Sequence, residues 1–291
     1  IARLLEVRHC GAACDSVKRL MLDHEHFEVE VLKSADYILP PADSYVTVAS
    51  GLTPSERASI ARRGTTVVVR ARGAADIEQL PARVAFAATS ALAEALSGLV
   101  YDEVVRRIET AASFAQHAIT APLGHNVFSP KQITVQLYRQ EDGTARLLTL
   151  GMVRFGSPDF TMRGAPMELG PSLAHLLNVA ASKAAEARTE PLVVALSDVA
   201  RVSTETAAAP TRGPWASSPI ELEATDTERI EGDPDNEMLE LMPRGGATRK
   251  AWAGAMTDLF GETPPVVFAG TDPELDAIAA RARMGYQPRW P

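Results

Sequence analysis

The clearest strand and turn signals in the second half of the chain lie in KQITVQLYRQEDGTARLLTLGMVRFGSPDFTM, residues 131–162. Two runs rich in apolar and β-branched residues, 131–138 and 145–155, flank the tetrapeptide EDGT. An Asp-Gly pair between two such runs is typical of a β-hairpin, because glycine accepts the positive φ of a tight turn. Residues 160–162 can add a third strand. The sequence therefore predicts an antiparallel hairpin sheet in this region.

The segment that ends this stretch, TLGMVRFGSPDF, has the composition of a sharp bend. Gly151 and Gly156 permit a positive φ or the close approach of another backbone. Asp159 can accept hydrogen bonds from local amides or stand in a cleft, and Arg154 can pair with it. Two interpretations are open: a structural bend stabilised by Asp159, or a ligand-facing loop with Gly151 and Gly156 as candidate ligand-binding residues.

Toward the N-terminus, four segments have the pattern of strands. Residues 26–32 (HFEVEVL) and 44–50 (SYVTVAS) alternate in polarity, as a half-buried strand does. Residues 65–70 (TTVVVR) are rich in β-branched side chains, which favour strands. Residues 1–8 are a further strand candidate.

Two helices are expected between these strands. Residues 12–22 carry apolar side chains at helical spacing, and a second helix begins at the capping box TPSE, where Thr53 and Glu56 can each bond the other's backbone amide. Gly64 ends this second helix. The resulting order, β-α-β-β-α-β, is that of a ferredoxin-like fold. We therefore expect a ferredoxin-like unit over residues 1–74.

The rest of the chain, residues 75–291, is expected to form a larger mixed α/β domain that contains the hairpin sheet, so the fold class is α+β. An exposed loop rich in Ser, Thr, Ala and Pro is expected over residues 202–218. Helices are expected over residues 82–96, 102–116, 170–187, 247–260 and 274–284, and short strands over 98–101, 191–196, 220–224, 238–241 and 265–269.

Composition narrows the classes of function. A net charge of −8 disfavours nucleic-acid binding, which needs a concentrated positive surface. No run approaches the roughly 20 apolar residues of a membrane span. Cys10 and Cys14 are the only cysteines, so we expect reduced thiols, with a local bridge as the alternative. The cytoplasm is therefore favoured. Phosphate-loop and dinucleotide-binding motifs are missing from the sequence, and no cofactor is expected.

Two motifs resemble a family of uncharacterised bacterial proteins that share a domain of unknown function. The motifs are GLVYDE at residues 98–103 and TLGMVRFGSPDF at residues 149–160, and the resemblance extends over about residues 82–187. The family's strand before the charged hairpin often carries histidines, whereas this chain reads KQITVQLY there. The resemblance implies bacterial relatives and implies no activity.

The candidate catalytic residues are Asp102, Arg154 and Asp159. Asp102 follows one predicted strand and precedes a predicted helix, where an aspartate commonly caps the first helical turn. The alternative is acid–base chemistry with Arg106 or Asp159 as its partner. No serine lies in a nucleophile elbow of the form G-x-S-x-G.

Metal binding is not expected from the sequence. Cys10, Cys14, His24 and His26 are all potential zinc ligands, but their spacing is not one of the common zinc motifs. The acidic run over residues 221–240 lacks the ligand order of a calcium loop, and a turn is the expected structure of its DPDN sequence.

Three functional hypotheses follow. The first is a non-catalytic binding or protein-interaction protein, with a protein partner or a second copy of itself. The second is a hydrolase-type enzyme with Asp102, Arg154 and Asp159 near one cleft. The third is a subunit of a larger assembly, which an exposed apolar face and a free strand edge on the first unit would support.

Overall fold

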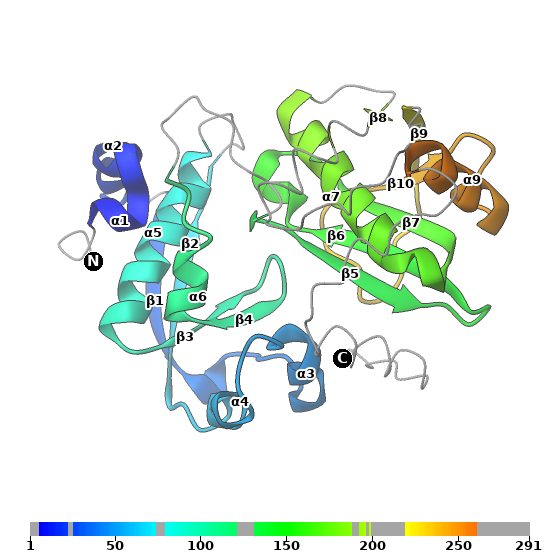
Figure 1. Cartoon of the computed structure of the whole chain (residues 1–291). Coiled ribbons are helices and arrows are strands. Elements are labelled where there is room, and N and C mark those ends of the chain that lie inside the picture. The colour runs from blue at the N-terminus through cyan, green and yellow to red at the C-terminus, as the bar shows by residue number, and fades with distance from the viewer. Residues whose placement is uncertain are drawn as a thin grey trace. The chain divides into compact units, whose positions relative to one another are not determined.

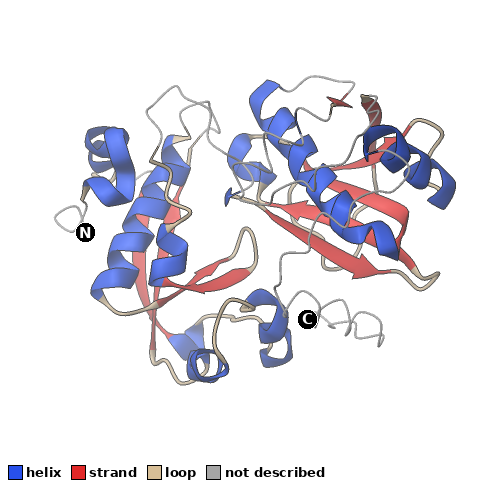
Figure 2. Cartoon of the chain, in the orientation of Figure 1, coloured by secondary structure: helices blue, strands red, loops and turns tan. Residues whose placement is uncertain are grey.

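The structure, a computed structural model, describes residues 6–22, 26–73, 79–120, 131–187, 192–195, 198 and 219–260. The chain divides into two compact units (Figure 1). The first unit comprises residues 1–127 and 154–156, and the second comprises residues 128–153 and 157–289. Helices and strands mix in both, so the predicted α+β class is confirmed (Figure 2).

The first unit contains two small sheets and several helices. Its elements are α1 (Val7–Cys10), α2 (Cys14–Leu20), β1 (Phe27–Lys33), α3 (Tyr45–Val48), α4 (Pro54–Ile60), β2 (Thr65–Ala71), α5 (Leu80–Ala95), β3 (Leu99–Asp102), β4 (Arg107–Thr110) and α6 (Ala111–Ala115), with short 3-10 helices at Gly11–Ala13, Ser34–Asp36 and Ala42–Ser44. The domain boundary expected at residue 74 falls inside this unit, because β2 and α5 share a hydrophobic core with α1 and α2.

Strands β1 and β2 form an antiparallel ribbon, and α5 lies beside it (Figure 1). The register runs without a bulge from Phe27 opposite Ala71 to Lys33 opposite Thr65. The strands predicted at residues 26–32 and 65–70 are therefore confirmed. The predicted capping box is confirmed too, since Thr53 and Glu56 bond each other's amides at the start of α4.

Two predicted strands of this unit are wrong. Residues 44–50 form a 3-10 turn and α3, because Tyr45, Val48, Ala49 and Leu52 are buried at i, i+3, i+4 and i+7, which is helical spacing. Burial of this stripe overrides the strand propensity of the β-branched residues.

The strand predicted over residues 1–8 is wrong where the structure describes it, because α1 begins at Val7. Cys10, Ala13, Cys14 and Val17 again form a buried helical stripe. The ferredoxin-like order is therefore not confirmed, and among the described residues β1 pairs only with β2.

The helix predicted over residues 102–116 is a hairpin followed by a short helix. Strands β3 and β4 pair from Leu99 opposite Thr110 to Asp102 opposite Arg107. Arg106 adopts a φ of 52°, which closes the turn and interrupts any helix. Thr110 then caps α6 by accepting a hydrogen bond from the Ser113 amide.

The second unit is built on a six-stranded sheet with the order β5-β6-β7-β10-β9-β8. The strands are β5 (Thr134–Arg139), β6 (Thr144–Leu150), β7 (Asp159–Pro166), β8 (Leu192–Val194), β9 (Ile220–Asp226) and β10 (Met238–Pro243). Among these described strands, β7 and β10 pair in parallel and the other neighbours pair antiparallel. The predicted hairpin, its third strand and the strands within residues 191–196, 220–224 and 238–241 are confirmed.

Among the described residues of this unit, the helices α7 (Gly170–Ala187) and α9 (Arg249–Phe260) pack on the sheet, both near their predicted bounds. All seven residues of β6 are buried, and Trp252 of α9 is fully buried with its indole nitrogen donating to the Arg163 carbonyl. None of the described helices is long and apolar enough to cross a membrane. The predictions for residues 202–218, 265–269 and 274–284 lie outside the described residues.

Candidate functional site

The bend between β6 and β7 is organised by Asp159, which is 1% exposed. Its Oδ1 accepts hydrogen bonds from the Thr149 hydroxyl at 2.9 Å and from the Met152 amide at 3.1 Å. Its Oδ2 accepts from the Asn236 side-chain amide at 2.9 Å. Asp159 therefore holds together the end of β6, the start of β7 and the loop before β10, as the structural-bend interpretation expects.

The two glycines of this segment have the backbone geometry that their residue type allows. Gly151 has a φ of 113° and Gly156 a φ of 61°, both in the region that side chains rarely adopt. Between them lies a 3-10 turn, Met152–Phe155. These conformations account for both glycines as parts of the bend, and whether either residue binds a ligand stays a prediction.

Arg154 pairs with Asp102, and both belong to the first unit. Its Nη2 lies 2.7 Å from Asp102 Oδ2, and its guanidinium lies 4.9 Å from the centre of the Phe86 ring. Asp102 also accepts from the Val104 amide at 3.2 Å, so it caps the β3–β4 turn rather than a helix. The structure thus brings together two of the three candidate catalytic residues, and their groups satisfy each other.

A second charged group, missed in the sequence, lies on the same hairpin. Glu109 is buried. Its Oε1 accepts a hydrogen bond from the Ser113 hydroxyl and is hydrogen-bonded to the His117 ring, each at 3.1 Å, and Arg107 Nε lies 3.2 Å from its Oε2. Burial raises the pKa of the Glu109 carboxyl, but hydrogen bonding to His117 and Ser113 and the nearby Arg107 charge outweigh it, so this pKa is lowered. The strand alternation of RIET, which places Arg107 and Glu109 on one face, was the available signal.

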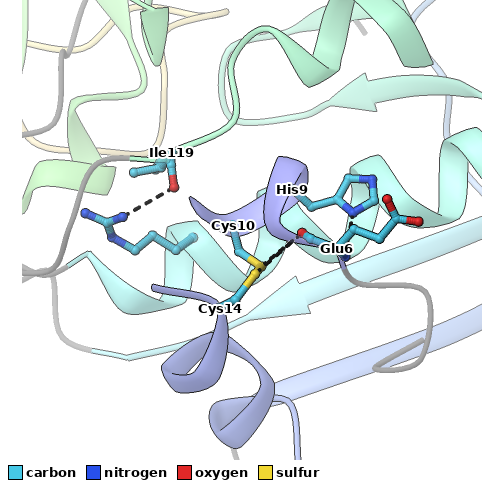
Figure 3. Close-up of a disulfide and its surroundings, with 6 residues drawn as sticks. Glu6, His9, Cys10, Cys14 and Ile119 are labelled. Atoms are coloured by element: carbon cyan, nitrogen blue, oxygen red, sulfur yellow. Dashed lines mark hydrogen bonds between the residues drawn. A yellow bond between two sulfur atoms is a disulfide. The ribbon is translucent and has the colours of Figure 1, made fainter. Parts of the chain in front are cut away.

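Cys10 and Cys14 are joined by a disulfide, which corrects the expectation of two reduced thiols (Figure 3). The 3-10 turn between them brings their Cα atoms to 4.9 Å, within the range a disulfide needs. Neither sulfur is then a thiolate available to zinc, and His24 lies outside the described residues. No metal-ligating cluster of three or more His, Cys, Asp or Glu occurs in the described part of the chain.

The acidic run before β10 serves the fold of the second unit. Asp233 and Arg146 form a bidentate pair with both N–O distances at 2.8 Å, and their side chains are 3% and 4% exposed. Asn236 of the same loop donates to the Ser157 carbonyl as well as to Asp159. Two residues of the predicted DPDN turn are therefore used for internal contacts.

A pocket of about 520 Å³ lies beside the start of α9 in the second unit. Its lining carries charges of both signs, Glu221 and Asp258 together with Arg244 and Lys250, all of them exposed. This mixture of charges selects no class of ligand.

The outer edges of the β1–β2 ribbon carry main-chain groups that point away from the ribbon. The Arg72 amide donates to the His26 carbonyl at 2.8 Å, and the Ser34 amide donates to the Gly64 carbonyl at 3.2 Å. Hydrogen-bonded and non-bonded pairs alternate in an antiparallel ladder. The main-chain amides and carbonyls of the even-numbered residues in each strand therefore point toward the other strand. The amides and carbonyls of the odd-numbered residues therefore point outward, and those of β2 are not hydrogen-bonded within the described part of the chain.

The two edges differ in chemistry. β1 (FEVEVLK) carries Glu28, Glu30 and Lys33, whereas β2 (TTVVVRA) carries only Arg70, which pairs with Glu30 at 2.9 Å. Charged side chains are a common protection against edge-to-edge pairing, together with proline and bulges. The edge of β2, with three consecutive valines, has little of this protection.

Comparison with protein-family models, with curated proteins and with solved structures finds no match to this chain. The class of protein thus rests on the geometry above, and the resemblance carried by GLVYDE and TLGMVRFGSPDF stays a prediction.

Proposed function

We propose that this protein is a non-catalytic protein-interaction protein whose first unit binds another protein chain along the outer edge of β2. The observation that carries the proposal is the row of outward main-chain groups on β2, at Thr65, Val67, Val69 and Ala71. An edge with free donors and acceptors can take an added strand, and the main-chain hydrogen bonds then supply affinity.

The surroundings of β2 support an interaction surface. Thr65 is exposed, and the three valines of β2 are only partly buried. On the neighbouring strand Val31 is 69% exposed, directly opposite Val67 in the ladder. A two-stranded ribbon is marginal unless it packs on other elements, and here the helices cover mainly one half of one face. Membership in a larger assembly is the broader form of the same proposal.

The hydrolase-type alternative has weaker support. Asp159, the carboxylate it needs beside Asp102, is occupied by donors of its own bend, and Asp102 is held by Arg154. A bacterial origin is proposed from the resemblance alone. The preference for the cytoplasm relied on reduced cysteines, and the Cys10–Cys14 bond withdraws that support because disulfides persist in oxidising compartments.

The test is the apparent mass of the protein in a native lysate, compared among three forms. Val67→Pro removes an outward donor of β2 and leaves the β1–β2 bonds intact, because residue 67 does not bond to β1. Val31→Pro does the same to β1 and is the matched control. We expect the wild type and Val31→Pro to migrate above the chain's 31.2 kDa and Val67→Pro to migrate at it. Equal migration of all three forms would contradict the proposal.

A further inference from the structure

We propose that the strand covering the outer edge of β2 is the β2 strand of a second copy of this chain, so that the protein is a two-fold symmetric dimer. The inference rests on the proposed function, since it names the partner of the same edge. It requires that β2 be complementary to itself in antiparallel orientation, and this can be examined residue by residue.

The register that pairs the strands end to end is centred on Val68. Thr65 then lies opposite the partner's Ala71, and Val67 lies opposite the partner's Val69. These are the residues whose main-chain groups point outward, so each such pair can exchange two hydrogen bonds, about eight in all. The two ribbons become one four-stranded antiparallel sheet in the order β1-β2-β2-β1.

The side chains of β2 are compatible with this pairing. Val68 lies opposite the partner's Val68, and a pair of β-branched residues packs favourably across two strands. The single charge of the strand, Arg70, lies opposite the partner's Thr66 rather than opposite another arginine. The pairing therefore brings no like charges directly against each other.

The edge of β1 is not complementary to itself in the end-to-end register. If β1 paired with itself end to end, Glu30 would lie opposite the partner's Glu30, and like charges directly opposite each other are destabilising. Pairing β1 with β2 of another copy is head-to-tail, and such contacts grow into open filaments unless they close in a ring. Of the two end-to-end pairings, only β2–β2 gives a closed dimer without a repulsive pair.

The face of the ribbon that the helices cover adds a further reason. The core of α1, α2 and α5 takes in Phe27, Val29, Val69 and Ala71, all at one end of the ribbon. The other end, with Thr65 and Val67, is outside that core. In the dimer the covered end of one copy lies beside the uncovered end of the other, so the partly exposed Val67 gains an apolar neighbour in the partner's Val69.

The test is a single-cysteine cross-link at the two-fold axis. In Val68→Cys the two thiols face each other across a non-bonded pair, where Cα atoms are about 4.5 Å apart, and disulfides form across about 4.4–6.8 Å. Glu30→Cys is the matched control, because Glu30 lies directly opposite Val68 within the ribbon. The native cysteines are already joined to each other and do not compete.

Under mild oxidation of the purified protein, we expect most of Val68→Cys to become a covalent dimer and Glu30→Cys to stay largely without a covalent cross-link. Equal cross-linking of the two variants, or none in Val68→Cys while it remains folded by circular dichroism, would overturn the dimer. If the lysate complex depends on Val67 and the purified Val68→Cys stays monomeric, the partner is a different protein, so the dimer fails and the proposed function stands.

Discussion

The six-stranded sheet of the second unit and the β1–β2 ribbon of the first differ in how far the chain itself covers them. Every residue of β6 is buried, whereas in β1 and β2 only Phe27 is. In the second unit, Asp233 of the loop before β10 is bonded internally to Arg146 of β6. Strand β6 of the larger sheet is thus covered by its own unit, whereas the ribbon leaves most of its side chains partly exposed, and we propose that it offers its outward main-chain groups to another chain.

The largest effect is expected from breaking the buried charge pair of the second unit. Arg146→Met removes the ion-pair partner of the buried Asp233 carboxylate, so we expect the free energy of unfolding to fall by about 3–5 kcal/mol. Urea unfolding measures this change. Arg229 is an exposed arginine of the loop that holds Asp233, so Arg229→Met is the control. It should change the free energy of unfolding by no more than about 0.5 kcal/mol. Equal effects of the two substitutions would show that the pair does not stabilise the unit.

A somewhat smaller loss is expected at the bend. Asp159→Asn replaces one acceptor oxygen by a donor among the Thr149, Met152 and Asn236 donors, so at least one buried group loses its hydrogen bond. We expect a loss of about 2–4 kcal/mol in the free energy of unfolding. Asp235→Asn, at an exposed position, should be nearly silent. If Asp159→Asn is silent as well, the bend does not depend on this carboxylate.

The next effect concerns pH and the first unit. A carboxyl whose pKa is lower in the folded than in the unfolded chain stabilises the fold above the unfolded value, 4.5 for Glu, and loses this contribution as the pH falls through the folded pKa. Glu109 is such a group. We expect Glu109→Gln to lose less unfolding free energy than the wild type between pH 7 and pH 3.5, as urea unfolding at both values would measure. The same loss in both proteins would refute the role assigned to Glu109.

The smallest effect is expected on the exposed face of the ribbon. Val31→Ala removes two methyl groups from a side chain that is 69% exposed, so the free energy of unfolding should change by no more than about 0.5 kcal/mol. Thermal or urea unfolding of the purified variant measures this. A loss of about 2 kcal/mol or more is typical of truncating a buried apolar side chain, and it would mean that this face of the ribbon is covered as β6 is.

The sequence predicted elements whose signals are local. The EDGT hairpin, the Thr53 capping box and the alternation of FEVEVL all specify their structure within a few residues, and all three are confirmed. The failures at residues 44–50 and 102–116 have a common cause. SYVTVAS reads as alternating, yet its buried residues follow helical spacing, and only tertiary packing decides between the two.

The candidate site was predicted in part for the same reason. The pairing of Asp159 with its own bend follows from residues within about ten positions in sequence, but the donor Asn236 is 77 positions away. Arg154 and Asp102 are separated by 52 positions, and nothing local specifies their pairing. The open edge of β2 depends on which strands pair, which single-sequence patterns do not determine.

The most direct test of the account is the mass of the purified protein by sedimentation equilibrium over a range of concentrations. The wild type and Val31→Pro are expected at twice the chain's 31.2 kDa, and Val67→Pro at 31.2 kDa. Val31→Lys and Val67→Lys provide a second matched pair should a proline variant fail to fold. A wild type that is monomeric throughout, a mass that keeps rising with concentration, or a dimer that Val67→Pro and Val31→Pro weaken equally would contradict the β2–β2 dimer.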